Sequence, residues 1–267
     1  MQILLGTSLT LEQSLAWNFS PVMLFVVCVA CPVTLSYLGL LVTRKIIPPH
    51  FHREHHDVTG PFFCTMGTVY GIFLALVVTT TWQSYISTGS NIVQEARCIG
   101  DLSTNSHAFD PSFQSQLQRL LRDYRNALVN LEWKNLAHGE GSPEATRLLD
   151  QITMTYANHK TSDSSENSFF SDSVRNLNRM KELRASRIDD ASSGLVPFLW
   201  CILLAGAVAT ISFTYLFGAQ NFVAQAVMTI LLAGVICMTL YTIVNLDFPF
   251  TGPVAISFEP LEKLRLN

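Results

Sequence analysis

The chain has 267 residues and a formal net charge of −3, and only 14% of its residues are charged. An average soluble domain carries about 25% charged residues, so this composition indicates a membrane protein, as does a mean hydropathy of +0.29. A nearly neutral chain lacks the basic surface that nucleic acids require, and we expect no nucleic-acid partner. Residues 1–20 contain no Lys or Arg. They therefore lack the basic start of a signal peptide, and we expect them to precede the first span as an N-terminal segment.

Three stretches contain no charged residue, and they lie between Glu12 and Arg44, between Asp57 and Glu95, and between Asp190 and Asp247. A helix needs roughly 20 apolar residues to cross a bilayer, and an apolar run in lipid must satisfy its own backbone groups. The first two stretches hold one such run each, and the third holds two. We therefore predict an all-α integral membrane protein with transmembrane helices at 21–43, 61–82, 195–216 and 222–246.

These spans leave a connection at 44–60, a polar stretch at 83–194 and a tail at 247–267. The polar stretch is typical of helices, because Asp110-Pro111 and Ser142-Pro143 each combine an N-cap residue with proline at the first helical position. The fold class is thus four transmembrane helices with a helical extramembrane domain between the second and third spans. Within that domain we expect a loop at 161–173, which is rich in Ser, Asp and Asn, and a last helix that runs straight into the third span.

Four spans place both termini and the domain on one side of the membrane. Lys and Arg near span ends mark the cytoplasmic side. The domain and the tail carry eight such residues, namely Arg97, Arg175, Arg179, Lys181, Arg184, Arg187, Lys263 and Arg265. The short connections carry three, namely Arg44, Lys45 and Arg53. We therefore expect a multi-pass protein of the cell membrane with both termini and the domain in the cytoplasm.

The connection holds the densest group of potential metal ligands, His50, His52, His55 and His56. Imidazoles suit zinc and similar ions, but the spacing fits no standard site. A polar collar beside a span, with charge that depends on pH, explains the histidines as well, and we favour no metal site. Cys28 and Cys31 have the spacing of a metal or redox pair, while small apolar packing residues are the alternative.

The second span carries two features of interest. Gly67 and Gly71 have the GxxxG spacing that lets helix backbones approach closely, either within one subunit or at a subunit interface around a pore. Tyr70, Leu74 and Val78 follow one another at steps of four. Such a stripe makes a hydrophobic constriction when several copies surround an axis, and otherwise it is core packing.

No Ser-His-Asp grouping, phosphate loop or carboxylate pair appears in a context that supports catalysis. The spans also contain no Asp, Glu, Lys, Arg or His for an ion relay. We therefore predict neither an enzyme nor a pump driven by carboxylates, and we expect no cofactor.

Short motifs spread from about residue 50 to the end resemble an uncharacterised, mainly bacterial family with a bestrophin-like domain. They are HDVTG at 56–60, VYGIFLALVV at 69–78, Trp82, QEA at 94–96, Glu132-Trp133, LVPFLW at 195–200, FTYLFG at 213–218 and LDFPFTG at 246–252. More distantly, the layout resembles the bestrophins, pentameric anion channels with four spans, cytoplasmic termini and a helical cytosolic domain. The resemblance implies a bilayer-embedded homo-oligomer that passes ions, with anions favoured.

The tail turn shows both the likeness and a departure. Pro249, Phe250 and Gly252 look like the stretch that opens the bestrophin calcium clasp, but the acidic run that follows there is missing here. Calcium needs six to eight oxygen ligands, so we expect no calcium site. Asp247, where the last span ends, either caps or pins this turn, with a domain arginine as a partner, or lies at a pore vestibule.

The leading functional hypothesis is thus a membrane-embedded ion channel or pore. The alternative is a non-conducting membrane sensor or scaffold whose domain binds a cytoplasmic protein partner. A metal-handling protein that uses the histidines is a third hypothesis.

Overall fold

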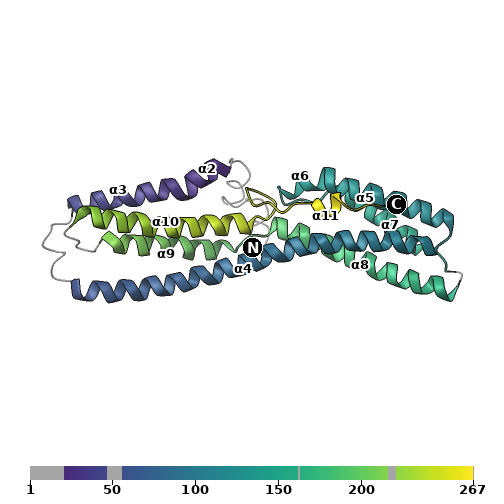
Figure 1. Cartoon of the computed structure of the whole chain (residues 1–267), viewed down its shortest axis with the longest axis horizontal. Coiled ribbons are helices and arrows are strands. Elements are labelled where there is room, and N and C mark those ends of the chain that lie inside the picture. Colours follow the sequence, from purple (N-terminus) through teal and green to yellow (C-terminus); the bar gives the residue numbers. More distant parts are fainter. Residues whose placement is uncertain (1–20, 47–55, 162, 216–220, 267) are drawn as a thin grey trace, which may run out of the picture. The chain divides into compact units, whose positions relative to one another are not determined.

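A computed structural model of the chain describes residues 21–46, 56–161, 163–215 and 221–266. In these ranges every regular secondary-structure element is helical (Figure 1). Four helical stretches are long and apolar enough to cross a membrane. The prediction of an all-α protein with four apolar helices is therefore confirmed.

The chain divides into two compact units. The unit that we call the membrane unit comprises Met1–Gln83, Leu195–Phe248 and Gly252–Val254. The unit that we call the central unit comprises Ser84–Gly194, Pro249–Thr251 and Ala255–Asn267.

The membrane unit contains the apolar helices. In chain order they are α2 (Pro21–Phe25), η1 (Val26–Ala30) and α3 (Cys31–Ile46), which follow one another without a break, then the first part of α4 (His56–Asn105), α9 (Pro197–Tyr215) and α10 (Phe222–Asp247). Helices α3, α9 and α10 pack against one another (Figure 1). Their buried positions combine apolar side chains with neutral polar ones, among them Thr214, Gln225 and Thr229.

The first apolar helix contains one wide turn. In η1 the N–H of Cys31 donates to the carbonyl of Val26, five residues back, so this turn is π-helical. Pro32 follows directly, and a proline inside a helix clashes with the carbonyl four residues earlier. Since that carbonyl belongs to Cys28 in the middle of η1, the wide turn makes room for the proline ring.

The central unit consists of the second part of α4 and the helices that follow it. These are η3 (Ser106–Ala108), α5 (Pro111–Ala127), η4 (Leu128–Glu132), α6 (Trp133–Leu136), α7 (Pro143–Ala157), α8 (Ser164–Ser192) and the short α11 (Glu259–Glu262). The two predicted N-caps are confirmed. Asp110 accepts the N–H groups of Ser112 and Phe113 at 3.0 Å, and the Ser142 hydroxyl accepts that of Ala145 at 3.4 Å.

Two expectations about the central unit are wrong. Most of the predicted loop at 161–173 is helical, because Asp163 caps α8 through the N–H of Ser164 at 2.6 Å and Phe170 packs against the core. The last helix also does not run into the third span. Helix α8 ends at Ser192 and α9 begins at Pro197, since proline disfavours a helical residue before it and suits a first helical position.

The end of the chain completes the core of the central unit. Phe250, Phe258 and Leu261 are buried there, and the edge of Trp133 meets the ring of Phe258 at a centroid distance of 4.4 Å. The carbonyl of Leu264 accepts a hydrogen bond from Arg125 Nη1 at 2.8 Å. The segment predicted as a tail is thus largely part of a folded unit.

Candidate functional site

The residues predicted to line a pore lie on a buried face of α4. Tyr70 and Leu74 are 8% and 7% exposed, and they share an apolar cluster with Leu203 of α9 and Ile236 of α10. Val78 is partly buried against the same cluster. We call this face the inner stripe. If these residues only pack the core, they are expected to be buried within one chain, as they are here. A pore-lining role for them stays a prediction.

Gly67 and Gly71 border the inner stripe on α4 and are open in the single chain, and the face opposite the stripe is exposed. A methyl group added at Gly67 or Gly71 would meet no atom within 4 Å, so neither glycine is in close contact with another helix of this chain. The same region carries exposed residues at steps of four, four, three and four. We call them the outer stripe, which consists of Thr68, Ile72, Leu76, Thr79 and Gln83.

The predicted tail turn is divided between the two units. Both carboxylate oxygens of Asp247 accept the backbone N–H of Leu195 at 2.9 Å, just before α9 begins. The contact ties Asp247 to the segment before α9 and not to the turn after α10, and its partner is a backbone amide and not an arginine. Both roles expected of Asp247 stay predictions. Gly252 has a φ of 73°, which glycine adopts readily. The carbonyl of Pro249 accepts the N–H of Ile256 at 2.8 Å in the central unit, where Phe250 is buried.

The histidine hypothesis falls mostly outside the described residues, since His50, His52 and His55 are not among them and the His56 side chain is not described. Where the structure describes the chain, no three His, Cys, Asp or Glu side chains come together as a metal site would need. Cys28 is half-buried and Cys31 exposed, and both are free thiols.

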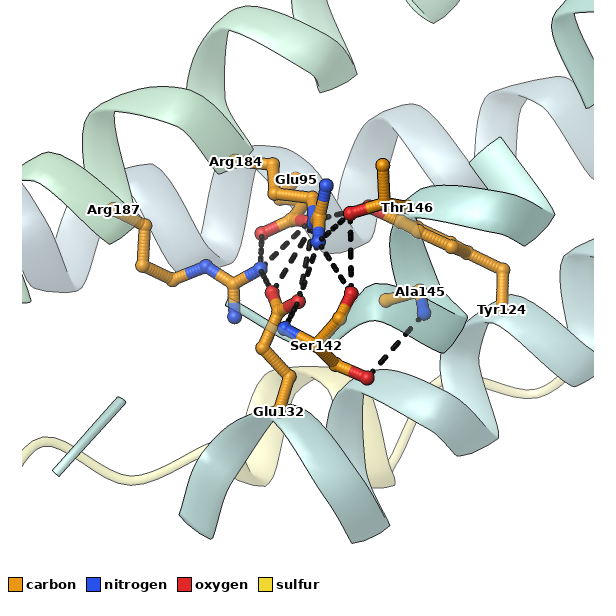
Figure 2. Close-up of polar contacts among 8 residues, drawn as sticks. All are labelled: Glu95, Tyr124, Glu132, Ser142, Ala145, Thr146, Arg184 and Arg187. Carbon is orange, nitrogen blue, oxygen red and sulfur yellow. Dashed lines mark hydrogen bonds and ion pairs between the residues drawn. The ribbon is translucent and has the colours of Figure 1, made fainter. Parts of the chain in front are cut away.

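The sequence did not reveal a group of charged side chains inside the central unit. Glu95, Glu132 and Arg187 are fully buried, and Arg184 is 7% exposed. We call these four residues the charge cluster (Figure 2). They come from three segments, α4, η4 and α8, and their two negative and two positive charges balance.

Glu132 is the most heavily bonded member of the charge cluster. It accepts hydrogen bonds from Nη2 of Arg184 and Nη2 of Arg187, each at 2.7 Å, and from the backbone N–H of Ser142 at 2.9 Å (Figure 2). The π-helical turn η4 ends at Glu132, next to the start of α7. A carboxylate at a helix N-terminus is favoured by the helix dipole, so Glu132 joins η4, α7 and α8.

Glu95 is held more weakly. Its Oε1 accepts the Tyr124 hydroxyl at 3.1 Å and Arg187 Nη2 at 3.2 Å. Among the described residues its Oε2 has no hydrogen-bond partner, and neither do Nε and Nη1 of Arg187. The Arg187 guanidinium lies over the Phe258 ring, with Cζ 5.2 Å from its centroid. Burial raises the pKa of Glu95, the nearby Arg187 opposes this, and the charge of Glu132 adds to it.

A signal for the charge cluster does exist in the sequence. On α8 buried residues recur at steps of three and four, at Ser173, Leu177, Met180, Arg184, Arg187 and Ala191, and Leu183 is buried beside them. The two arginines thus occupy core positions of an amphipathic helix. The count of Lys and Arg near the span ends treats them only as positive residues, whereas the periodicity places both in the core.

The helices form a known protein architecture. The family model of the bestrophin-like domain matches residues 30–261. The chain belongs to the bestrophin-like family. No curated protein matches the chain.

Solved structures agree with the family. Two point variants of a bacterial bestrophin homologue from Klebsiella pneumoniae are similar, with TM-scores of 0.66 and 0.64, 10% identity, and coverage of 87% of this chain and 94% of theirs. A variant of a membrane protein matches with a TM-score of 0.62 and 11% identity, over 86% of this chain and 94% of its own. At these identities the likeness shows the bestrophin-like fold alone.

Proposed function

We propose that this bestrophin-like chain assembles into a homo-oligomeric channel that passes small anions across the cell membrane. The central unit and both termini lie in the cytoplasm in this proposal, as the distribution of Lys and Arg favours. Family membership supports the class of function, because bestrophins are known as anion channels.

The observation that carries the proposal is the outer stripe of α4. The Thr68 and Thr79 hydroxyls donate to carbonyls of α4 itself, at 2.7 and 2.8 Å, so they face the surface at little cost. The Gln83 amide makes no hydrogen bond with another described residue. Gln83 directly follows the span predicted at 61–82, so its amide lies at the membrane surface, where bulk water, a water-filled path or a neighbouring subunit satisfies it.

The apolar members of the outer stripe suit a gate. Ile72 and Leu76 are 58% and 61% exposed in the single chain. When several copies surround an axis, such residues form a narrow apolar ring that disfavours water. The inner stripe meanwhile packs α4 against α9 and α10.

Chloride flux from liposomes that contain the full chain tests the proposal. We expect flux from the wild type without added calcium, and greater flux from the double variant Ile72→Ala and Leu76→Ala. Val208→Ala and Leu231→Ala serve as matched controls, because both side chains are exposed on other apolar helices. A monomer in mild detergents, or no flux from either protein with the fold intact, contradicts the channel and favours the scaffold alternative.

A further inference from the structure

Tyr70 of α4 occupies a notch on α9 that only a glycine leaves open. A methyl group at Gly206 would lie 2.4 Å from Cε2 and 2.6 Å from Cδ2 of the tyrosine ring. The Tyr70 hydroxyl donates to the carbonyl of Leu203 at 2.9 Å, and this bond is buried. Because real Cβ contacts do not approach so closely, an alanine at 206 forces the ring or the whole helix to move.

A second contact of this kind occurs in the membrane unit, and we call each such contact of a tyrosine ring with a glycine on another helix a joint. Tyr215 of α9 lies against Gly39 of α3, where a methyl group would be 2.7 Å from its hydroxyl oxygen and 3.1 Å from Cζ. The Tyr215 hydroxyl donates to the carbonyl of Ser36 at 2.9 Å. In both joints the accepting carbonyl belongs to the residue three positions before the glycine. The ring therefore fills a one-residue gap, and the hydroxyl binds the adjacent turn of the same helix.

The two joints differ in what they connect. Helices α3 and α9 also pack directly against each other and against α10. Arg44 of α3 bonds to Gln225 of α10 at 2.6 Å, and Gln225 bonds to the Thr214 carbonyl of α9 at 3.0 Å. In the membrane part of α4, by contrast, the threonine hydroxyls donate to carbonyls of α4 itself. The hydrogen bond of Tyr70 therefore connects α4 to α9, whereas the hydrogen bonds of these threonines stay within α4.

We propose that Tyr70 and Gly206 are positioning residues of the channel, which set the separation of α4 from α9 and thereby the placement of the outer stripe. This inference rests on the proposed channel function. Gly206 fixes how close the two helices come, and the tyrosine hydroxyl fixes their register along the helix axis. The joint between Tyr215 and Gly39 has the same chemistry but does not touch α4, which makes it a matched comparison.

The separation itself is measurable without any conduction. Spin-label amino acids at Val69 of α4 and Val208 of α9, both exposed, report the distance between the two helices in the full chain in lipid nanodiscs. We expect Gly206→Ala to lengthen this distance, whereas Gly39→Ala leaves it unchanged. Gly71→Ala, whose methyl group meets nothing, controls for the effect of alanine on α4. Combining Gly206→Ala with Tyr70→Val removes the ring that clashes, so the distance returns toward the wild-type value.

Ion selectivity gives the readout that a merely structural role does not change. We expect Gly206→Ala and Tyr70→Phe to shift the reversal potential between small and large anions, while Gly39→Ala and Tyr215→Phe alter thermal stability only. An unchanged distance in Gly206→Ala, or an equal selectivity shift from both joints, overturns the inference. If the distances change as expected but the wild type passes no ions, the joint holds α4 as inferred and the channel proposal fails.

Discussion

In the membrane unit the buried polar side chains are neutral, whereas the central unit buries four charges. Among the described residues, the membrane unit buries Ser, Thr, Gln and Asn, and the central unit buries two Glu and two Arg that bond to one another. A charge in hydrocarbon is expensive, and a buried charge elsewhere is tolerated only when it is paired and hydrogen-bonded. Each unit thus uses the strongest polar contact that its surroundings tolerate.

The difference predicts how much each contact contributes to stability. Hydrogen bonds between membrane helices contribute on average about 0.6 kcal/mol, since the unfolded segments also find partners in the bilayer. Breaking a buried ion pair costs about 3–5 kcal/mol, because the remaining charge is left without a partner. Substitutions in the two units should therefore differ in effect even where the distances are similar.

The largest effect is expected from Glu132→Gln. Glutamine keeps the shape and the bond to the N–H of Ser142, but it leaves two buried arginines with Glu95 as their single negative partner. We expect a loss of about 3–5 kcal/mol, visible as faster hydrogen exchange in the amides of α7 and α8 and as a lower unfolding temperature.

Glu140→Gln is the matched control for this change. Glu140 lies in the same region but is exposed, and surface substitutions usually stay within about 0.5 kcal/mol. Equal effects from the two variants would show that the charge cluster contributes no more than a surface residue.

A smaller effect is expected from Gln225→Leu in the membrane unit. The Gln225 carboxamide bonds to Nε and Nη2 of Arg44 at 2.9 and 2.6 Å and to the carbonyl of Thr214 at 3.0 Å. Contacts between membrane helices contribute at most about 1.7 kcal/mol each, so the loss of the contacts to Arg44 and Thr214 should cost less than Glu132→Gln. Unfolding in detergent, followed by circular dichroism, measures this cost. A loss as large as that of Glu132→Gln would remove the contrast between the units.

The sequence predicts what local rules govern and misses what depends on partners. Asp110 and Ser142 were predicted as N-caps, because a cap needs only its own helix. The ion pairs of Arg184 and Arg187 were not predicted, since the glutamates that neutralise them are 52 to 92 residues away in the sequence. The helical spacing marks both arginines as core positions, but nothing in the local sequence identifies the glutamates that pair with them.

The two stripes of α4 show a second limit. Tyr70 and Leu74 are buried, while Ile72 and Leu76 are exposed in the single chain, yet all four are apolar. In a bilayer the residues that face lipid are as apolar as those that face other helices. Periodicity therefore locates a stripe but does not say which side packs, and the stripe first predicted to line a pore is the one that the chain buries.

The charge cluster also predicts a pH dependence that the neutral contacts of the membrane unit lack. Burial raises the pKa of Glu95 above its ordinary value of about 4.5, so the folded protein holds this proton to a higher pH than the unfolded chain does. Its contribution to stability is fully present below the unfolded pKa and is lost as the pH rises through the folded pKa, with a slope of at most about 1.4 kcal/mol per pH unit.

The difference between wild type and Glu95→Gln isolates this contribution, because glutamine does not titrate. We expect the wild type to lose stability relative to the variant as the pH rises from about 4.5, as measured by thermal unfolding across a pH series. A constant difference over that range would mean that Glu95 titrates alike in the folded and unfolded states.

The smallest effect is expected from Thr229→Val. The Thr229 hydroxyl donates to the Thr214 hydroxyl at 3.1 Å, and both side chains are buried between α9 and α10. Valine has nearly the same shape, and the Thr214 hydroxyl still donates to the carbonyl of Ile211 at 2.6 Å, so no buried donor loses its partner. We expect a loss of about 0.6 kcal/mol by thermal unfolding in detergent, with Thr239→Val as the control, since the Thr239 hydroxyl bonds within α10 and is exposed. A loss several times larger would mean that neutral contacts in the membrane unit stabilise the fold as strongly as the ion pairs of the central unit, and the contrast between the units would then come from composition and not from energy.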